Sequence, residues 1–181
     1  MAARPSWVVI DADVLSRRVV EPGQPALKQL AEHFSSDILN TDGTLNRKRL
    51  AEKAFSSSVE TAALNAIVHP AVRSEIEREL RKAAESGKRV AIIDAPLLLQ
   101  AGLDAICDYT VAVVSTPELR KARIMMRDGL TEEEATRRMS VQPSDNHYQT
   151  RVTALLHNLG DRKALRAAAL SVCATIEDLA I

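Results

Sequence analysis

The segment Trp7–Ile10 constrains the fold most, because it is a short, unbroken apolar run that is rich in β-branched residues. Such a run is typical of a strand buried on both faces of a parallel sheet. Two carboxylates, Asp11 and Asp13, follow directly, and in open α/β sheets ligands bind at this carboxyl end of the strands. We therefore expect at least one carboxylate to have a chemical role, and one of them to cap the helix that begins near Val14.

Later apolar runs predict three more strands. The segment RVAIIDAPLLL contains the run Val90–Ile93, which again delivers an acid, Asp94, at its carboxyl end. A third strand is expected at Tyr109–Ser115, and a weaker fourth at Val152–Leu159. Strands that alternate with helical patterns predict an α/β fold with a parallel sheet.

Helical periodicity fills the segments between these strands. The proline of His69-Pro70 disfavours a helical conformation for the residue before it, so an interruption is expected there. Phe55 is expected to point inward together with Leu50 and Ala54. Helices are predicted at 14–20, 25–34, 45–55 and 59–86, in a hairpin at 117–142 that Gly129 breaks, and from Asp161 onward.

Composition excludes several classes of protein. The 24 basic and 24 acidic residues among the 181 cancel, which argues against a general binder of nucleic acid or of membrane surfaces. No apolar run is long enough to span a membrane and no signal peptide is evident, so a cytoplasmic location is expected. Cys107 and Cys173 lie far apart without metal-ligand spacing, and we interpret them as reduced thiols.

The strand-end acids and the arginine-rich hairpin suggest phosphate chemistry. Carboxylates at strand ends can hold Mg²⁺ or take a proton from a hydroxyl, and arginines on a closing lid can neutralise phosphate charge. The hairpin arginines could equally be solvated and paired with Glu132–Glu134, so both interpretations stay open. His69 could contact a substrate or act as a cap or turn residue. The arginines in question are Arg120, Arg123, Arg127, Arg137 and Arg138.

Several segments, in order, resemble the landmarks of the dephospho-coenzyme A kinase family. They are IDADVLSRRVVEPGQPAL, DGTLNRKRL, LNAIVHPAVR, IIDAPLLLQAGLD, MRDGLTEEEATRRMSVQPS and HNLGD. The resemblance implies a P-loop-kinase-like fold, a three-layer parallel sheet flanked by helices. It also implies a single domain over residues 1–181, with a helical substrate-side region at about 24–86 and a helical lid at about 117–142. The implied reaction is phosphorylation of the 3′-hydroxyl of dephospho-coenzyme A by ATP and Mg²⁺, the last step of coenzyme A synthesis.

The resemblance also assigns roles to individual residues. Asp13 would orient or deprotonate the 3′-hydroxyl, Asp94 would lie near Mg²⁺ at the end of a Walker B-like strand, and Arg127 would reach the phosphates from the lid. The remaining positions that match the family are Asp11, Arg47 and His69 on the substrate side, and Asn158 on the nucleotide side.

The sequence departs from the family in three places. No segment matches G-x-x-x-x-G-K-[ST], the glycine-rich loop whose backbone amides cradle nucleotide phosphates, and only MAARPS precedes the first predicted strand. Gln100 stands where the family usually has glutamate, and Thr153 where it usually has aspartate. The central first strand and the P-loop are therefore expected to be absent and the kinase activity impaired. The alternatives are a non-catalytic coenzyme-A-binding or interaction paralogue and a truncated kinase.

Overall fold

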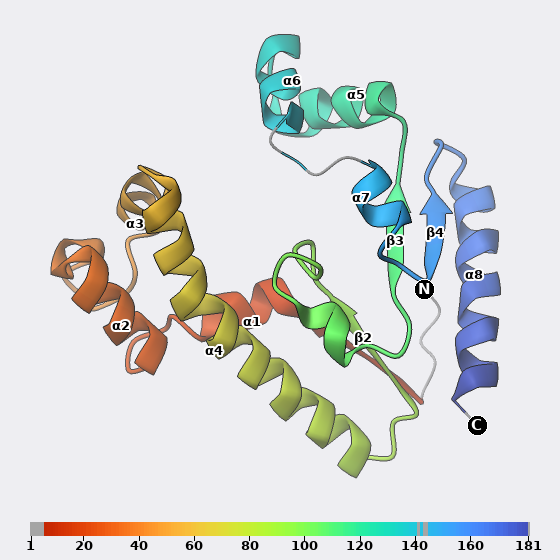
Figure 1. Ribbon diagram of the computed structural model, residues 1–181, viewed down its shortest axis with the longest axis horizontal. Coiled ribbons are helices and arrows are strands. Elements are labelled where there is room, and N and C mark those ends of the chain that lie inside the picture. The colour runs from red at the N-terminus through yellow and green to blue at the C-terminus, as the bar shows by residue number, and fades with distance from the viewer. Residues whose placement is uncertain (1–5, 141, 143–144, 181) are drawn as a thin grey trace. The chain divides into compact units, whose positions relative to one another are not determined.

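The computed structural model describes residues 6–140, 142 and 145–180, and its helices and parallel strands make an α/β protein (Figure 1). The chain divides into two compact units, Met1–Leu103 and Asp104–Ile181. Each unit contains one pair of parallel strands with helices beside it. Among the described helices, none combines the length and the apolar character that crossing a membrane would require.

The strand pair of the first unit confirms two of the predicted strands. Strand β1 (Trp7–Asp11) pairs in parallel with β2 (Val90–Asp94), with Asp11 opposite Asp94 in the register. Alternate residues of a strand point to opposite faces, and here only one face is well covered. Ile10 is buried, whereas Val9 is 59% exposed. The expectation that β1 is buried on both faces is therefore wrong.

Helices supply most of the core of the first unit. The side chains of Leu30, Ile38 and Ile76 are fully buried. Phe55, expected to point inward, is 69% exposed, because it follows the last residue of its helix and no longer obeys the helical spacing. The elements are α1 (Ala12–Arg18), α2 (Pro25–Phe34), the 3₁₀ helix η1 (Ser36–Ile38), α3 (Arg47–Ala54) and α4 (Ser58–Glu85).

Helix α4 runs through Pro70 without a break, so the predicted interruption at His69-Pro70 is wrong. A proline inside a helix costs about 3 kcal/mol, because it removes one hydrogen bond and clashes with the preceding turn. Helix α4 packs against α1, α2 and α3 and buries Val72 and Ile76, and tertiary packing of this kind supplies most helical stability in proteins. His69 consequently lies in a helix interior and is neither a cap nor a turn residue.

The second unit confirms the other two predicted strands. Strand β3 (Val111–Val114) pairs in parallel with β4 (Ala154–His157). At the start of this ladder, the Thr153 amide donates to the Thr110 hydroxyl at 3.0 Å, and the Thr110 amide donates to the Thr153 hydroxyl at 3.2 Å. Thr153 thus takes part in joining the two strands.

Local signals define the helices of the second unit. Gly129, with φ 67°, ends α5 in the left-handed conformation, which glycine adopts easily. Thr131 and Glu134 then form a capping box, in which the Thr131 amide donates to the Glu134 carboxylate at 2.8 Å. The elements are the 3₁₀ helix η2 (Leu103–Ile106), α5 (Pro117–Asp128), α6 (Glu132–Ser140), α7 (Asp145–Gln149) and α8 (Arg162–Leu179).

The four strands form two separate two-stranded sheets, β1-β2 and β3-β4. The resemblance led us to expect strands of one parallel sheet. Within the described residues no hydrogen-bonded ladder joins β2 to β3. The parallel pairing and the flanking helices agree with the expected fold class.

Candidate functional site

Three predicted site residues gather at the carboxyl ends of the strands in the first unit. Asp11 and Asp94 are register partners on neighbouring strands, and Asp13 lies in the first turn of α1. The Asp11 carboxylate accepts a hydrogen bond of 3.0 Å from the Val14 amide, so Asp11 is the predicted capping acid. Strand pairing and one helix start therefore place all three acids on a single edge.

The carboxylates of Asp13 and Asp94 are the groups of this edge that remain open to a ligand. Both residues are exposed, and within the described part of the chain neither side chain makes a hydrogen bond or an ion pair. No cluster of three or more potential metal-binding side chains occurs among the described residues. Mg²⁺ needs only one or two carboxylates when phosphates and waters complete its shell, so these acids fit that ion.

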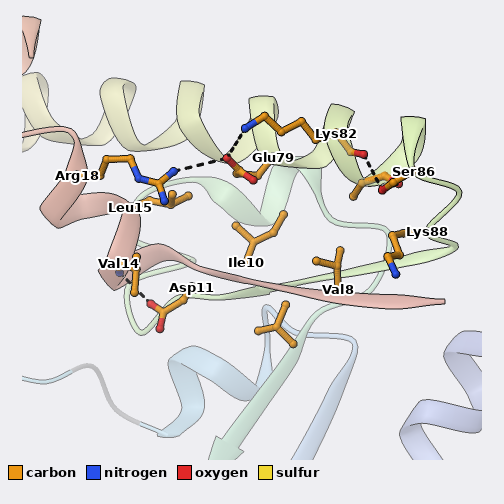
Figure 2. A pocket seen from close by; sticks show the side chains of 12 residues that line it. Val8, Ile10, Asp11, Val14, Leu15, Arg18, Glu79, Lys82, Ser86 and Lys88 are labelled. Atoms are coloured by element: carbon orange, nitrogen blue, oxygen red, sulfur yellow. Dashed lines mark hydrogen bonds and ion pairs between the residues drawn. The ribbon is translucent and has the colours of Figure 1, made fainter. Parts of the chain in front are cut away.

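A pocket of about 390 Å³ lies beside β1, with α1 and α4 contributing to its walls (Figure 2). Ile10 and Leu15 line its apolar side, and Asp11 lies at one end. Glu79 on α4 contacts Lys82 at 3.0 Å and Arg18 at 3.6 Å. The pKa of Glu79 is lowered, first by the hydrogen bond from Lys82. These contacts join α1 to α4 and keep both cations close to a carboxylate.

The two other predicted substrate-side residues lie on different helices of the same unit. Arg47 is the first residue of α3 and is exposed, and His69 is half-buried in the middle of α4. Neither residue lines the pocket beside β1. Their assignment to substrate binding stays a prediction.

The second unit carries a positively charged pocket of about 600 Å³ on the α5–α6 hairpin. Apolar atoms of Ile124 and Met126 also line it. Arginine guanidinium groups match phosphate oxygens in geometry and charge, so the pocket fits a polyphosphate. The polar residues that line it are Arg120, Arg123, Arg127, Arg138 and Gln142. Arg137, also considered from the sequence, does not line it.

Arg123 connects this pocket to the carboxyl ends of β3 and β4. Its guanidinium donates to the Ser115 hydroxyl at 3.2 Å and to the Asn158 side-chain oxygen at 3.1 Å. The Ser115 hydroxyl in turn donates to the Asn158 carbonyl at 2.8 Å. These hydrogen bonds therefore hold Asn158, a predicted nucleotide contact, next to the pocket on the α5–α6 hairpin. Sequence reasoning missed Ser115, although a polar residue directly after a strand was an available signal.

Asp128 is a second residue that sequence reasoning missed. Its carboxylate accepts from Arg127 Nε at 2.7 Å and Nη2 at 2.9 Å, and from Arg138 Nη1 at 2.7 Å. The Arg127 hydrogen bond is the main reason that the pKa of Asp128 is lowered, and the same bond raises the pKa of Arg127. The available signal was an acid between an arginine and the Gly129 turn. Arg127 and Arg138 are thus ordered by one shared carboxylate.

Comparisons with known proteins agree on one family. The sequence model of the dephospho-CoA kinase family matches residues 2–163. A dephospho-CoA kinase from Corynebacterium glutamicum is 42% identical over 170 residues, which cover 94% of this chain and 85% of the relative. A dephospho-CoA kinase from Anaeromyxobacter dehalogenans is 38% identical over 157 residues, covering 87% and 74%.

Two solved structures share the fold of this chain. The crystal structure of TT1252 from Thermus thermophilus superposes with a TM-score of 0.73 at 31% identity and covers 93% of this chain and 84% of its own. A dephospho-CoA kinase from Campylobacter jejuni gives a TM-score of 0.69 at 21% identity, covering 97% and 87%, and supports the fold. On the family match and the sequence relatives together, this chain belongs to the dephospho-CoA kinase family.

Proposed function

We propose that this chain phosphorylates the 3′-hydroxyl of dephospho-coenzyme A with ATP, and that its two units act together as one kinase domain. Family membership supports the reaction class. The single observation that carries the proposal is the pairing of two kinds of site in one chain. Exposed carboxylates without a partner stand at the ends of parallel strands, and four arginines line one pocket. Phosphoryl transfer needs both kinds of group.

The acceptor side is assigned to the first unit. Asp13 would accept a proton from the attacking hydroxyl, because its carboxylate is exposed and no described residue neutralises it. Asp94, on the neighbouring strand, would hold Mg²⁺, an ion that neutralises phosphate charge when bound. Asp11 is engaged as a helix cap, and its contribution would be to fix the position of α1. Arg47 and His69 are assigned to contacts with the rest of the substrate.

The phosphate side is assigned to the arginine pocket of the second unit. Arg127 would contact the transferred phosphoryl group, because it lines the pocket and its side chain is 68% exposed. Arg123 would hold Asn158 beside the nucleotide. Phosphoryl transfer depends mainly on positioning and on stabilising charge, and these side chains provide both.

A second candidate is a non-catalytic protein that binds dephospho-coenzyme A. A specific observation favours it: residues 1–181 contain no G-x-x-x-x-G-K-[ST] motif, the loop that supplies backbone amides to nucleotide phosphates. Gln100 and Thr153 also stand where the resemblance led us to expect acidic residues. For this reason we expect turnover by these 181 residues to be slow compared with relatives that carry the loop.

Calorimetry with each ligand separately, followed by a turnover assay, tests the proposal. We expect dephospho-coenzyme A to bind, ATP with Mg²⁺ to bind more weakly, and coenzyme A to form when the two are mixed. Binding of dephospho-coenzyme A with no product at high protein concentration would support the non-catalytic candidate. Tight binding of ATP by the chain alone would refute the expectation that the missing loop weakens the nucleotide site.

A further inference from the structure

Two of the arginines that line the pocket on the α5–α6 hairpin share one carboxylate. Arg127 and Arg138 both line the pocket, whereas Asp128 does not. Asp128 nevertheless contacts both guanidinium groups at 2.7–2.9 Å. The carboxylate therefore holds the two arginines from outside the space that a ligand would fill.

We propose that Asp128 is a positioning residue that holds Arg127 and Arg138 ready for the phosphates of ATP. This inference rests on the proposed function and deepens it, because it names the group that orders the phosphate-binding side chains. A guanidinium has five N–H donors, and Asp128 engages Nε and Nη2 of Arg127 but only Nη1 of Arg138. The other donors of each arginine remain able to bind phosphate oxygens.

The backbone brings these residues together. Asp128 is the last residue of α5, and Gly129 turns the chain so that α6 packs against α5. Arg138, ten positions further along the chain, thereby reaches the Asp128 carboxylate. The side chain of Asp128 is 23% exposed and that of Arg138 is 52% exposed, so this ion pair lies at the protein surface.

The substitution Asp128→Asn distinguishes a positioning role from a purely electrostatic one, because the two roles predict opposite changes in the affinity for a polyphosphate. Asp128→Asn removes a negative charge next to a cationic pocket, so electrostatics alone would strengthen the binding of a polyphosphate. The substitution also releases two long side chains, whose rotamer freedom must then be lost on binding. If Asp128 positions the arginines, binding becomes weaker although the pocket becomes more positive.

The hairpin offers a matched control. Lys121 on α5 and Glu132 on α6 form an ion pair of 2.5 Å between the same two helices. Neither residue lines the pocket. Glu132→Gln therefore removes an interhelical ion pair and one negative charge, as Asp128→Asn does. Unlike Asp128→Asn, it keeps the hydrogen bonds from Arg127 and Arg138 to the Asp128 carboxylate. A purely structural role for Asp128 would make the two variants behave alike.

The test is calorimetric titration of the full 181-residue chain with inorganic tripolyphosphate at low ionic strength. We expect roughly tenfold weaker binding for Asp128→Asn, a change of less than about twofold for Glu132→Gln, and partial recovery for Asp128→Glu. In turnover, KM for ATP should rise more than kcat falls. Equal or tighter binding by Asp128→Asn, or an equal loss in both variants, would overturn the proposal.

The outcome separates this inference from the proposed kinase activity. If the unaltered chain binds tripolyphosphate but forms no coenzyme A, the kinase proposal fails, and the binding comparison still decides the role of Asp128. If the unaltered chain does not bind tripolyphosphate, the positioning role is refuted whatever the turnover.

Discussion

Two parts of the candidate site are positioned in different ways. They are the acid edge of the first unit (Asp11, Asp13 and Asp94) and the arginine pocket of the second unit, which is the pocket on the α5–α6 hairpin. Asp11 and Asp94 are placed by strand register and by a helix cap. Arg123, Arg127 and Arg138 are placed by hydrogen bonds from their own side chains to Asn158 and Asp128. Backbone geometry resists salt and changes of single side chains, whereas ion pairs on an exposed helix do not.

The two regions also differ in how firmly they are anchored. The first unit has fully buried side chains such as Leu30 and Ile76. Helix α5, by contrast, has no buried residue. Elements with few buried apolar contacts open at low free-energy cost. We therefore expect the strand ends that carry Asp11 and Asp94 to be more rigid than helix α5, which carries Arg123 and Arg127. A lid that closes over a substrate requires such mobility.

The largest expected effect tests the chemistry of the acid edge. Asp13→Asn should reduce the rate of phosphoryl transfer by roughly 10²- to 10⁴-fold, because it removes a general base. Stability should change little, since the side chain is exposed and makes no hydrogen bond or ion pair with a described residue. Rapid-quench assays and thermal denaturation measure the two effects. A large loss of stability with the rate retained would show that Asp13 has a structural role instead.

The next effect compares the anchoring of the two units. Ile76→Ala should cost about 2–5 kcal/mol of unfolding free energy, because it leaves a cavity at a fully buried position. Leu165→Ala on α8, at a half-buried position, should cost less. Urea denaturation of both variants gives the comparison. Equal losses would contradict the idea that the first unit holds the better-packed core.

A third pair of variants separates the two arginine environments. Arg123→Met should destabilise the second unit by roughly 1.5–3 kcal/mol, since Ser115 and Asn158 lose a charged hydrogen-bond donor in a part-buried site. Arg127→Met should cost clearly less, because its ion pair is exposed to solvent. Denaturation followed by far-UV circular dichroism checks this order. A larger loss for Arg127→Met would contradict the conclusion that the hydrogen bonds of Arg123 to Ser115 and Asn158 stabilise the second unit.

A smaller effect concerns the helix cap at the acid edge. Asp11→Ala should lower the unfolding free energy by about 1 kcal/mol, because the Val14 amide loses its acceptor. Asp11→Asn should behave like the original residue in stability, since asparagine caps equally well. If the asparagine variant is as unstable as the alanine variant, charge and not capping explains the role of Asp11.

The smallest effect is a dependence on pH. The pKa of Asp128 is lowered, mainly by the hydrogen bond from Arg127. A carboxyl with a lowered pKa stabilises the fold above its ordinary value of about 4, and this contribution is lost as the pH falls below that value. The difference in thermal midpoint between the original chain and Asp128→Asn should therefore shrink between pH 7 and pH 3. A constant difference would exclude the charge of Asp128 as its cause.

Much of the fold could be predicted because its signals are local. Apolar runs such as Trp7–Ile10 and Val90–Ile93 became strands, and Gly129 ended a helix. The break at Pro70 was wrong, because packing between helices outweighed a local penalty. The exposed face of β1 was missed because a run of apolar residues does not reveal which face a helix covers.

The candidate site was predictable in part. Acids at strand ends point to a common edge, and the register confirms that Asp11 and Asp94 meet there. The roles of Ser115 and Asp128 depend on contacts with Arg123 and Arg138, which lie eight and ten residues away. Spacing in the sequence does not determine which arginine forms an ion pair with a given carboxylate. These pairs were found only in the structure.

The most direct test of the kinase proposal is the identity of the product. The 181-residue chain, in excess over dephospho-coenzyme A, is incubated with ATP and Mg²⁺, and the product is analysed by mass spectrometry and ³¹P NMR. We predict a single added phosphoryl group on the ribose 3′-hydroxyl, formed slowly and lost in Asp13→Asn. Unchanged dephospho-coenzyme A that remains bound to the protein would contradict the account.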